Sequence, residues 1–164
     1  MAKGVGLDPG EYEIKVVELD GSYKKPRLAK VSIDRVSQTT AAASDAGHAA
    51  REAEVALHAL KDAKISRDNV ILGFPCREAV LRKLTVPFRG ADQIRKVIKF
   101  EVEESIHSHN VDEMVVDFHT LEEVDDGTQV MVAAVPKAPL RVTLDALEEM
   151  GIDPEFVDLD TMAL

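Results

Sequence analysis

The sequence is short of cysteine, aromatic residues and long apolar runs, and each shortage narrows what the protein can be. Cys76 is its single cysteine, so no internal disulfide can form, which suits a reducing compartment. There is no run of about 18 apolar residues, and the first four residues do not resemble a signal peptide. We therefore expect a protein of the cytoplasm that does not itself cross a membrane.

Positive charge is also scarce. The chain has 20 Lys and Arg against 30 Asp and Glu, which gives a formal net charge of -10. Nucleic-acid binding needs clustered cations, so we expect no nucleic-acid partner, and a basic protein segment would suit an acidic surface better. With 164 residues, 45% of them apolar and 30% charged, the composition is that of one globular domain or of two small lobes.

Motifs for catalysis are missing as well. The sequence holds no Gly-x-Ser-x-Gly elbow, no Walker lysine loop and no dinucleotide-binding glycine run. Cys76 has no neighbouring His or Cys, so we interpret it as a small buried side chain rather than a nucleophile. We expect no catalytic residues in this chain and no enzymatic activity.

One cluster raises the alternative of a metal site. His107-Ser108-His109 is flanked by Glu103, Glu104 and Asp112, and imidazoles and carboxylates are metal ligands. However, the histidines follow a predicted helix end, where they interact favourably with the last carbonyls. The cluster also lacks distant Cys or His partners, so we expect no metal.

Hydrophobic periodicity predicts a chain in two parts, and the pattern of predicted elements changes at Arg77. In the first part, the second and third strands join around Asp20-Gly21 by a loop that continues through Lys25-Pro26. The elements predicted there are three strands in residues 4–34, a helix over residues 44–64 with one apolar stripe, and an inner strand over residues 69–74.

The second part looks like an insertion. Lys99 stands four residues before Glu103 on its predicted helix, a spacing that favours a surface ion pair.

The chain ends at Met162-Ala163-Leu164, which looks like the first residues of a helix, and we expect it to be truncated. The predicted elements are strands over residues 80–86, 114–121, 129–135 and 156–159, a helix over residues 91–106, and a helix that starts near Pro139 and stops at Gly151.

The most informative stretch is the beginning of the chain, Gly4–Leu19. A short apolar strand runs into Asp8-Pro9-Gly10, turns, and returns as a strand that carries Lys15, in the manner of an actin-type phosphate loop. Where such loops offer hydroxyls to phosphate, this one has Glu11 and Tyr12. Two like charges about 4 Å apart repel by roughly 4 kcal/mol at a dielectric near 20, which exceeds one lost hydrogen bond of about 1 kcal/mol. Nucleotide binding at Asp8, Gly10 and Lys15 is therefore disfavoured.

The sequence resembles the PilM family of type IV pilus assembly proteins and their type II secretion relatives, the GspL cytoplasmic domains. Actin-like division proteins such as FtsA share the same plan. The resemblance covers nearly the whole chain as the N-terminal half of the family. The matching stretches are 6–10, 15–19, 73–75, 84–87, 101–106, 112–113, 116–118, 132–137 and 151–158.

The resemblance implies an α/β, actin-like (RNase H-like) fold. Residues 1–76 and 153–164 would form subdomain 1A, and residues 77–152 an inserted α+β lobe like the subdomain called 1C. ATP and Mg²⁺ would be cofactors only of a complete protein, because a second phosphate loop and an adenosine pocket belong to the other half. We expect no cofactor in this chain.

The resemblance also implies a function. We expect a cytoplasmic scaffold, peripheral to the inner membrane, that binds the cytoplasmic tail of a bitopic PilN-like protein near the junction of the lobes and relays to an assembly ATPase. An actin-superfamily ATPase and a filament-forming FtsA-like protein are the alternatives. The side chains we predict to line an apolar slot for the peptide, between the inserted helix and the first lobe, are Phe88, Ile94, Ile98, Phe118 and Leu121.

Overall fold

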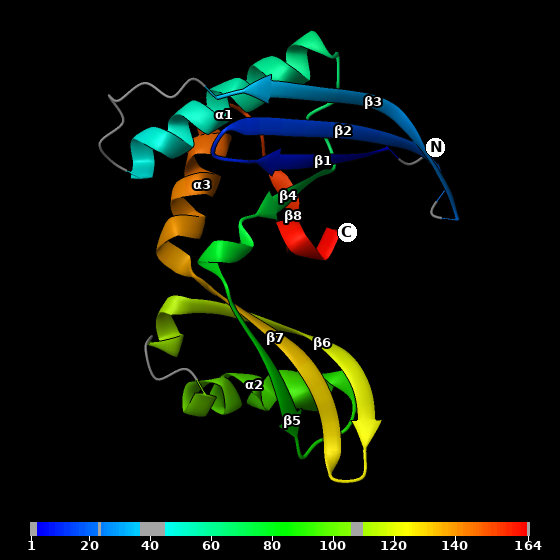
Figure 1. Ribbon diagram of the computed structural model, residues 1–164, viewed down its shortest axis with the longest axis vertical. Coiled ribbons are helices and arrows are strands. Elements are labelled where there is room, and N and C mark those ends of the chain that lie inside the picture. The colour runs from blue at the N-terminus through cyan, green and yellow to red at the C-terminus, as the bar shows by residue number, and fades with distance from the viewer. Residues whose placement is uncertain (1–2, 23, 37–44, 106–109, 164) are drawn as a thin grey trace. The chain divides into compact units, whose positions relative to one another are not determined.

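The chain folds into two compact units (Figure 1). The computed structural model describes residues 3–22, 24–36, 45–105 and 110–163. The first unit comprises Met1–Cys76 and Pro139–Leu164, and the second comprises Arg77–Ala138. The inserted lobe was predicted to extend to residue 152, whereas the second unit ends at Ala138. The helix that begins at Lys137 buries Ala146 and Leu147 in the core of the first unit, which accounts for the earlier boundary.

A mixed five-stranded sheet in the order β3-β2-β1-β4-β8 forms the first unit. β1 is central: it pairs antiparallel with β2 and parallel with β4, and β4 pairs parallel with β8. The strands are β1 (Gly4–Pro9), β2 (Glu13–Ser22), β3 (Lys25–Arg35), β4 (Val70–Phe74) and β8 (Pro154–Leu159).

Two helices, α1 (Asp45–Asp62) and α3 (Lys137–Glu149), contribute to the core of this unit. α1 buries small residues at spacings of three and four, which confirms the predicted apolar stripe. The buried residues it shares with the sheet include Ala53, Ala56, Leu60, Val5, Leu7, Ile14, Val16, Val70 and Leu72. Short 3₁₀ turns follow β4 and β8, at Cys76–Glu78 and Asp160–Ala163.

The hairpin between β2 and β3 is longer than the sequence predicted. Ser22 pairs with Lys25, and Gly21 pairs with Pro26, so the segment expected to be a loop is already strand. Gly21 has a φ of +107°, and a Cβ there would lie 2.6 Å from the carbonyl oxygen of Lys25. A glycine that accepts positive φ lets the strands stay paired to the end of the hairpin.

The sheet also carries exposed apolar side chains. Val17 pairs with Val31 and with Gly6, Gly6 with Ile71, and Ile71 with Phe156, so these five residues form one row across all five strands. Val31, Ile71 and Phe156 are 49%, 45% and 61% exposed. Alternation along β1 and β2 places this row on the face opposite the core residues Leu7 and Val16.

Glu18 is the one charged side chain that is buried in the described part of the chain, at 2% exposure. Its Oε1 atom lies 3.5 Å from Lys3 Nζ and 3.7 Å from Lys30 Nζ. Lys30 Nζ also donates a hydrogen bond to the carbonyl oxygen of Lys64, just beyond α1. This ion cluster therefore connects β2 and β3 with Lys3, which directly precedes β1, and with the segment that follows α1.

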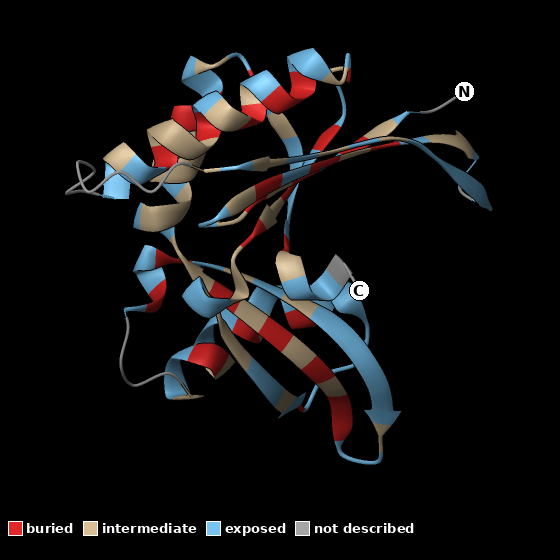
Figure 2. Cartoon of the chain, turned by 45° about the horizontal axis from the view of Figure 1, so that its top comes forward, coloured by how far each residue is buried: buried red, intermediate tan, exposed pale blue. Residues whose placement is uncertain are grey.

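The second unit is a three-stranded antiparallel sheet in the order β5-β7-β6 with one helix, α2. Alternate residues of the middle strand are buried, as Figure 2 shows along β7. Its core includes Ile94, Ile98 and Val102 of α2 together with Val130 and Val132 of β7. The elements are β5 (Val80–Val86), α2 (Ala91–Ser105), a 3₁₀ turn at Val111–Glu113, β6 (Met114–Val124) and β7 (Gly127–Pro136).

Within the described ranges, the structure contains no helix with the length and apolar character needed to cross a membrane.

The buried carboxylate provides a test of the first unit. Lys30→Ala should lower the free energy of unfolding by roughly 2–4 kcal/mol, because it removes one of the two cations that face the buried charge and leaves only Lys3, whose side chain is more exposed. Glu18→Leu in the same background should recover most of that loss, since the unpaired charge is then gone. Urea unfolding followed by circular dichroism measures both, and Lys25→Ala on the same strand, expected within about 0.5 kcal/mol of the parent, is the control. Equal losses in the single and double variants would contradict this role of Glu18.

A pair of glycines tests the second unit. Both have positive φ, but a Cβ on Gly127 would lie 2.0 Å from the carbonyl oxygen of Val86, whereas a Cβ on Gly90 would meet no heavy atom within 4 Å. Gly90→Ala should therefore cost only about 1–2 kcal/mol of backbone strain. Gly127→Ala should cost at least about 3 kcal/mol, because the backbone of β5 must move as well. Thermal unfolding compares the two, and equal costs would show that the hairpin adapts to a side chain.

Candidate functional site

The turn between β1 and β2 brings together the three residues predicted for a phosphate loop. Asp8 and Lys15 face each other across the strands, and Asp8 Oδ2 lies 3.2 Å from Lys15 Nζ. The N–H of Gly10 donates to the carbonyl oxygens of Asp8 and Glu13, each at 3.1 Å. A Cβ on Gly10 would lie 2.7 Å from the oxygen of Glu13, so the tightness of this turn requires glycine.

The two charged residues predicted for a phosphate loop are paired with each other. The side chain of Lys15 is 48% exposed and that of Asp8 is 42% exposed, and the two form an ion pair with each other. Glu11 and Tyr12 are exposed at the tip of the turn. A phosphate approaching Lys15 would have to compete with Asp8 and pass near Glu11.

Cys76 lies half-buried where β4 ends, and its backbone N–H donates to Asp160 Oδ1 at 3.0 Å. In the residues that the structure describes, no group of three His, Cys, Asp or Glu side chains is arranged to hold a metal ion. The His107-Ser108-His109 cluster considered above lies outside those residues.

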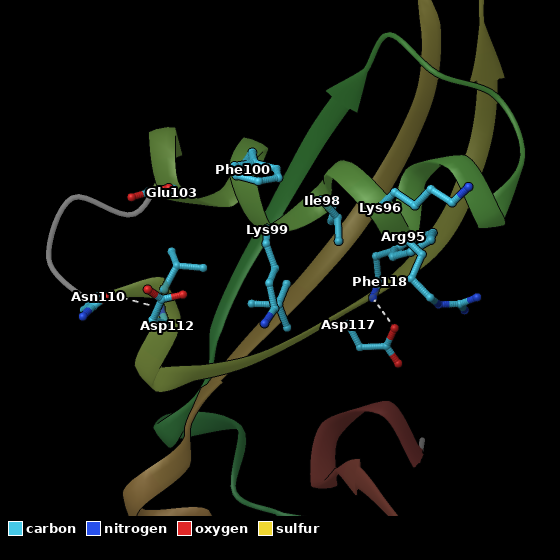
Figure 3. A pocket seen from close by; sticks show the side chains of 12 residues that line it. Arg95, Lys96, Ile98, Lys99, Phe100, Glu103, Asn110, Asp112, Asp117 and Phe118 are labelled. Carbon is cyan, nitrogen blue, oxygen red and sulfur yellow. Dashed lines mark hydrogen bonds between the residues drawn. The ribbon is translucent and has the colours of Figure 1, made fainter.

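A groove of about 320 Å³ lies within the second unit, along α2, β6 and the 3₁₀ turn before β6 (Figure 3). Its floor is apolar and its rim is charged. The side chains that line it are Arg95, Lys96, Ile98, Lys99, Phe100, Glu103, Asn110, Val111, Asp112, Val116, Asp117 and Phe118.

The amphipathic pattern of α2 explains how these side chains reach the groove. Ile94 and Ile98 face the core, so Arg95 and Lys99, one position further along the helix, flank it. The Arg95 guanidinium lies 5.8 Å from the centre of the Phe118 ring and 3.7 Å from Asp92 Oδ1. A cation this close to an aromatic face is attracted by it, which places Arg95 over β6.

Charge is unevenly distributed along the groove. Arg95 and Lys96 lie at the end near Phe118 together with one carboxylate, that of Asp117 (Figure 3). Glu103 and Asp112 lie near the other end, and Lys99 lies between the two ends. The predicted ion pair between Lys99 and Glu103 does not form, and neither Lys96 nor Lys99 has an ion-pair partner among the described residues. Two ammonium groups beside an apolar floor are therefore available to a ligand.

The five apolar residues predicted for a peptide slot have different surroundings. Ile94 and Ile98 are 0% and 2% exposed and belong to the core, although Ile98 also lines the groove, as does the partly buried Phe118. Phe88 and Leu121 are 37% and 44% exposed and lie outside it. The role of this set in peptide binding stays a prediction.

Sequence reasoning missed the cations of the groove. The signal was present, because Arg95, Lys96 and Lys99 lie within five residues in a chain that is otherwise acidic. The negative net charge of the chain predicts acidic rims and basic ligands instead. Phe100, which is 70% exposed, was also missed, because an apolar residue on a helix is usually part of the core.

Comparison with known proteins gives a consistent result. A family model described as "Type IV pilus assembly protein PilM" matches residues 6–164. A chain of a "PilM-PilN type IV pilus biogenesis complex" is similar in structure, with a TM-score of 0.82 and 24% identity over 98% of this chain and 48% of that chain. No curated protein matches the sequence significantly.

A second solved structure is the cytoplasmic domain of EpsL, an inner-membrane component of the type II secretion system of Vibrio cholerae. It has a TM-score of 0.62 and 19% identity over 99% of this chain and 59% of that chain. The chain thus spans between about half and three-fifths of the length of these two structures. The matches confirm the predicted resemblance and the actin-like α/β fold class.

The turn between β1 and β2 gives a test of nucleotide binding. Titration of the chain with Mg-ATP in a calorimeter should show no saturable heat at micromolar concentrations, because Lys15 is paired with Asp8 and Glu11 repels phosphate. A mixture of magnesium and AMP, which lacks the terminal phosphates, is the control for non-specific heat. Micromolar binding of Mg-ATP that Lys15→Ala abolishes would overturn the expectation.

Proposed function

The chain belongs to the type IV pilus assembly protein PilM family, and from this we propose that it is an actin-like adaptor that binds the cytoplasmic tail of a PilN-like inner-membrane protein. It is a component of a type IV pilus or type II secretion assembly platform. The proposed place of action is the cytoplasmic face of the inner membrane, reached through that partner. A further proposed contact is the assembly ATPase.

The observation that carries this proposal is the fold likeness to a chain of the PilM-PilN complex, which extends over 98% of this chain. Within that fold, the described turn between β1 and β2 supports a binding role over ATP turnover, because Asp8 and Lys15 neutralise each other. The second unit adds exposed apolar side chains, including Phe88 and Leu121. Apolar side chains at a surface are the usual anchors for a peptide segment.

The proposal is tested by titrating the chain with a synthetic peptide of the cytoplasmic tail of the PilN-like protein from the same organism. We expect saturable micromolar binding, detected by fluorescence anisotropy, and none by a scrambled peptide of the same composition. Phe88→Ala and Leu121→Ala should each weaken binding several-fold by removing apolar contact. Leu28→Ala, the same truncation as Leu121→Ala at an exposed side chain of the first unit, is the control.

Two results would count against the proposal in different ways. If the tail and its scrambled version bind equally, or neither binds, the adaptor role fails. If the tail binds specifically but both variants bind it as the parent does, the adaptor role stands and the assignment of Phe88 and Leu121 fails.

A further inference from the structure

We propose that the groove between α2 and β6 is a second docking site, which binds an extended protein segment by adding a strand to the edge of β6. The segment would carry an acidic side chain and, two residues away, an apolar one. The proposal goes beyond the binding of a membrane-protein tail and does not depend on it. Three features of the second unit carry it: a strand edge without a strand partner, an apolar floor, and two lysines, Lys96 and Lys99, that have no ion-pair partner among the described residues.

β6 is an edge strand. It pairs only with β7, which lies between β6 and β5, so one side of the β6 backbone has no strand partner within the described second unit. The groove is lined by Val116, Asp117 and Phe118, three successive residues of β6. Since successive side chains of a strand point to opposite faces, a groove that touches all three lies along the edge of the strand. A helix beside a free strand edge is the arrangement in which extended peptides bind by strand addition.

The floor of the groove offers a place for an apolar side chain. Ile98, Val111 and Phe118 line it, and Phe100 is 70% exposed beside it. Only Phe74 of the five phenylalanines is buried, whereas two of the five line this groove. On an added strand, the side chains of residues i and i+2 point to the same face. If the side chain of residue i lies on the apolar floor, that of residue i+2 therefore lies near the rim.

The rim determines the charge of that neighbour. Lys96 and Lys99 have no ion-pair partner among the described residues, and Arg95 lies over Phe118. Of the carboxylates that line the groove, that of Asp117 accepts a hydrogen bond from the backbone N–H of Phe118 at 2.9 Å.

The other two carboxylates, those of Glu103 and Asp112, lie near the far end of the groove (Figure 3). At the end near Phe118, Arg95 and Lys96 outnumber the carboxylate of Asp117, and Lys99 lies beside them. This end therefore favours an acidic side chain of the segment, although the chain as a whole is acidic.

The probe is a display library of random linear twelve-residue peptides, selected on the immobilised full chain. We expect enriched peptides to share Asp or Glu two residues from Phe, Leu, Ile or Val. The best peptide, resynthesised with a fluorophore, should bind Lys99→Glu about tenfold more weakly than the parent, because attraction becomes repulsion. Lys83→Glu makes the same charge change at an exposed site of β5 in the same unit, and it should bind as the parent does.

Strand addition is tested separately, on the peptide. N-methylation of alternate amides removes donors from one edge of an extended peptide. Methylation on one edge should abolish binding, and methylation on the other edge should leave it unchanged. ¹⁵N-labelled protein should show the largest amide shifts in residues 115–120 of β6.

The outcomes are decisive. A selection without a consensus, a basic consensus, or equal binding by Lys99→Glu and Lys83→Glu would overturn the proposal. Equal effects of methylation on both edges, or on neither, would overturn strand addition. Circular dichroism of each variant confirms that it is folded before binding is compared. Because the membrane-protein tail is not the probe, this experiment and the tail titration can fail independently.

Discussion

The parallel pairing of β4 with β8 is the constraint on which the rest of the structure depends. These strands are neighbours in the first sheet, where Leu72 pairs with Val157 and Phe74 with Leu159, although the whole second unit lies between them in the sequence. A parallel pair always needs a crossover connection, and here that connection contains a complete unit followed by α3. The chain leaves the first unit after β4 and returns to it through α3, and the second unit has a core of its own.

The turn between β1 and β2 is shaped by close contacts of its own backbone. Gly10 is needed because its backbone approaches Glu13 too closely for a Cβ, and that requirement is independent of any ligand. Asp8 and Lys15, the residues predicted for a phosphate loop, form a cross-strand pair. Such a half-exposed pair contributes little to stability. The turn therefore serves to join the central strand of the sheet to its neighbour.

Net charge proved a poor guide to the surface of the second unit. The chain carries ten more negative than positive charges, yet cations concentrate along two turns of α2. Electrostatic interactions with a ligand decay over about 8–10 Å in physiological salt, so the side chains within that range matter more than the total. Exposed Phe100 and partly buried Phe118 beside these cations make the surface both apolar and charged, which is the usual composition of a protein interface.

The sequence by itself determined the elements, because periods of two and of 3.6 residues follow directly from strand and helix geometry. It also determined the family and the Gly10 turn. Tertiary structure alone decided that α3 belongs to the first unit, that Ile94 is core while Phe88 is exposed, and that Lys99 is unpaired beside the edge of β6. The physical reason is that these properties depend on which surfaces meet. The sequence does not show whether an apolar residue of a helix faces the core or the solvent. Residues that are distant in the sequence become neighbours only when the chain folds.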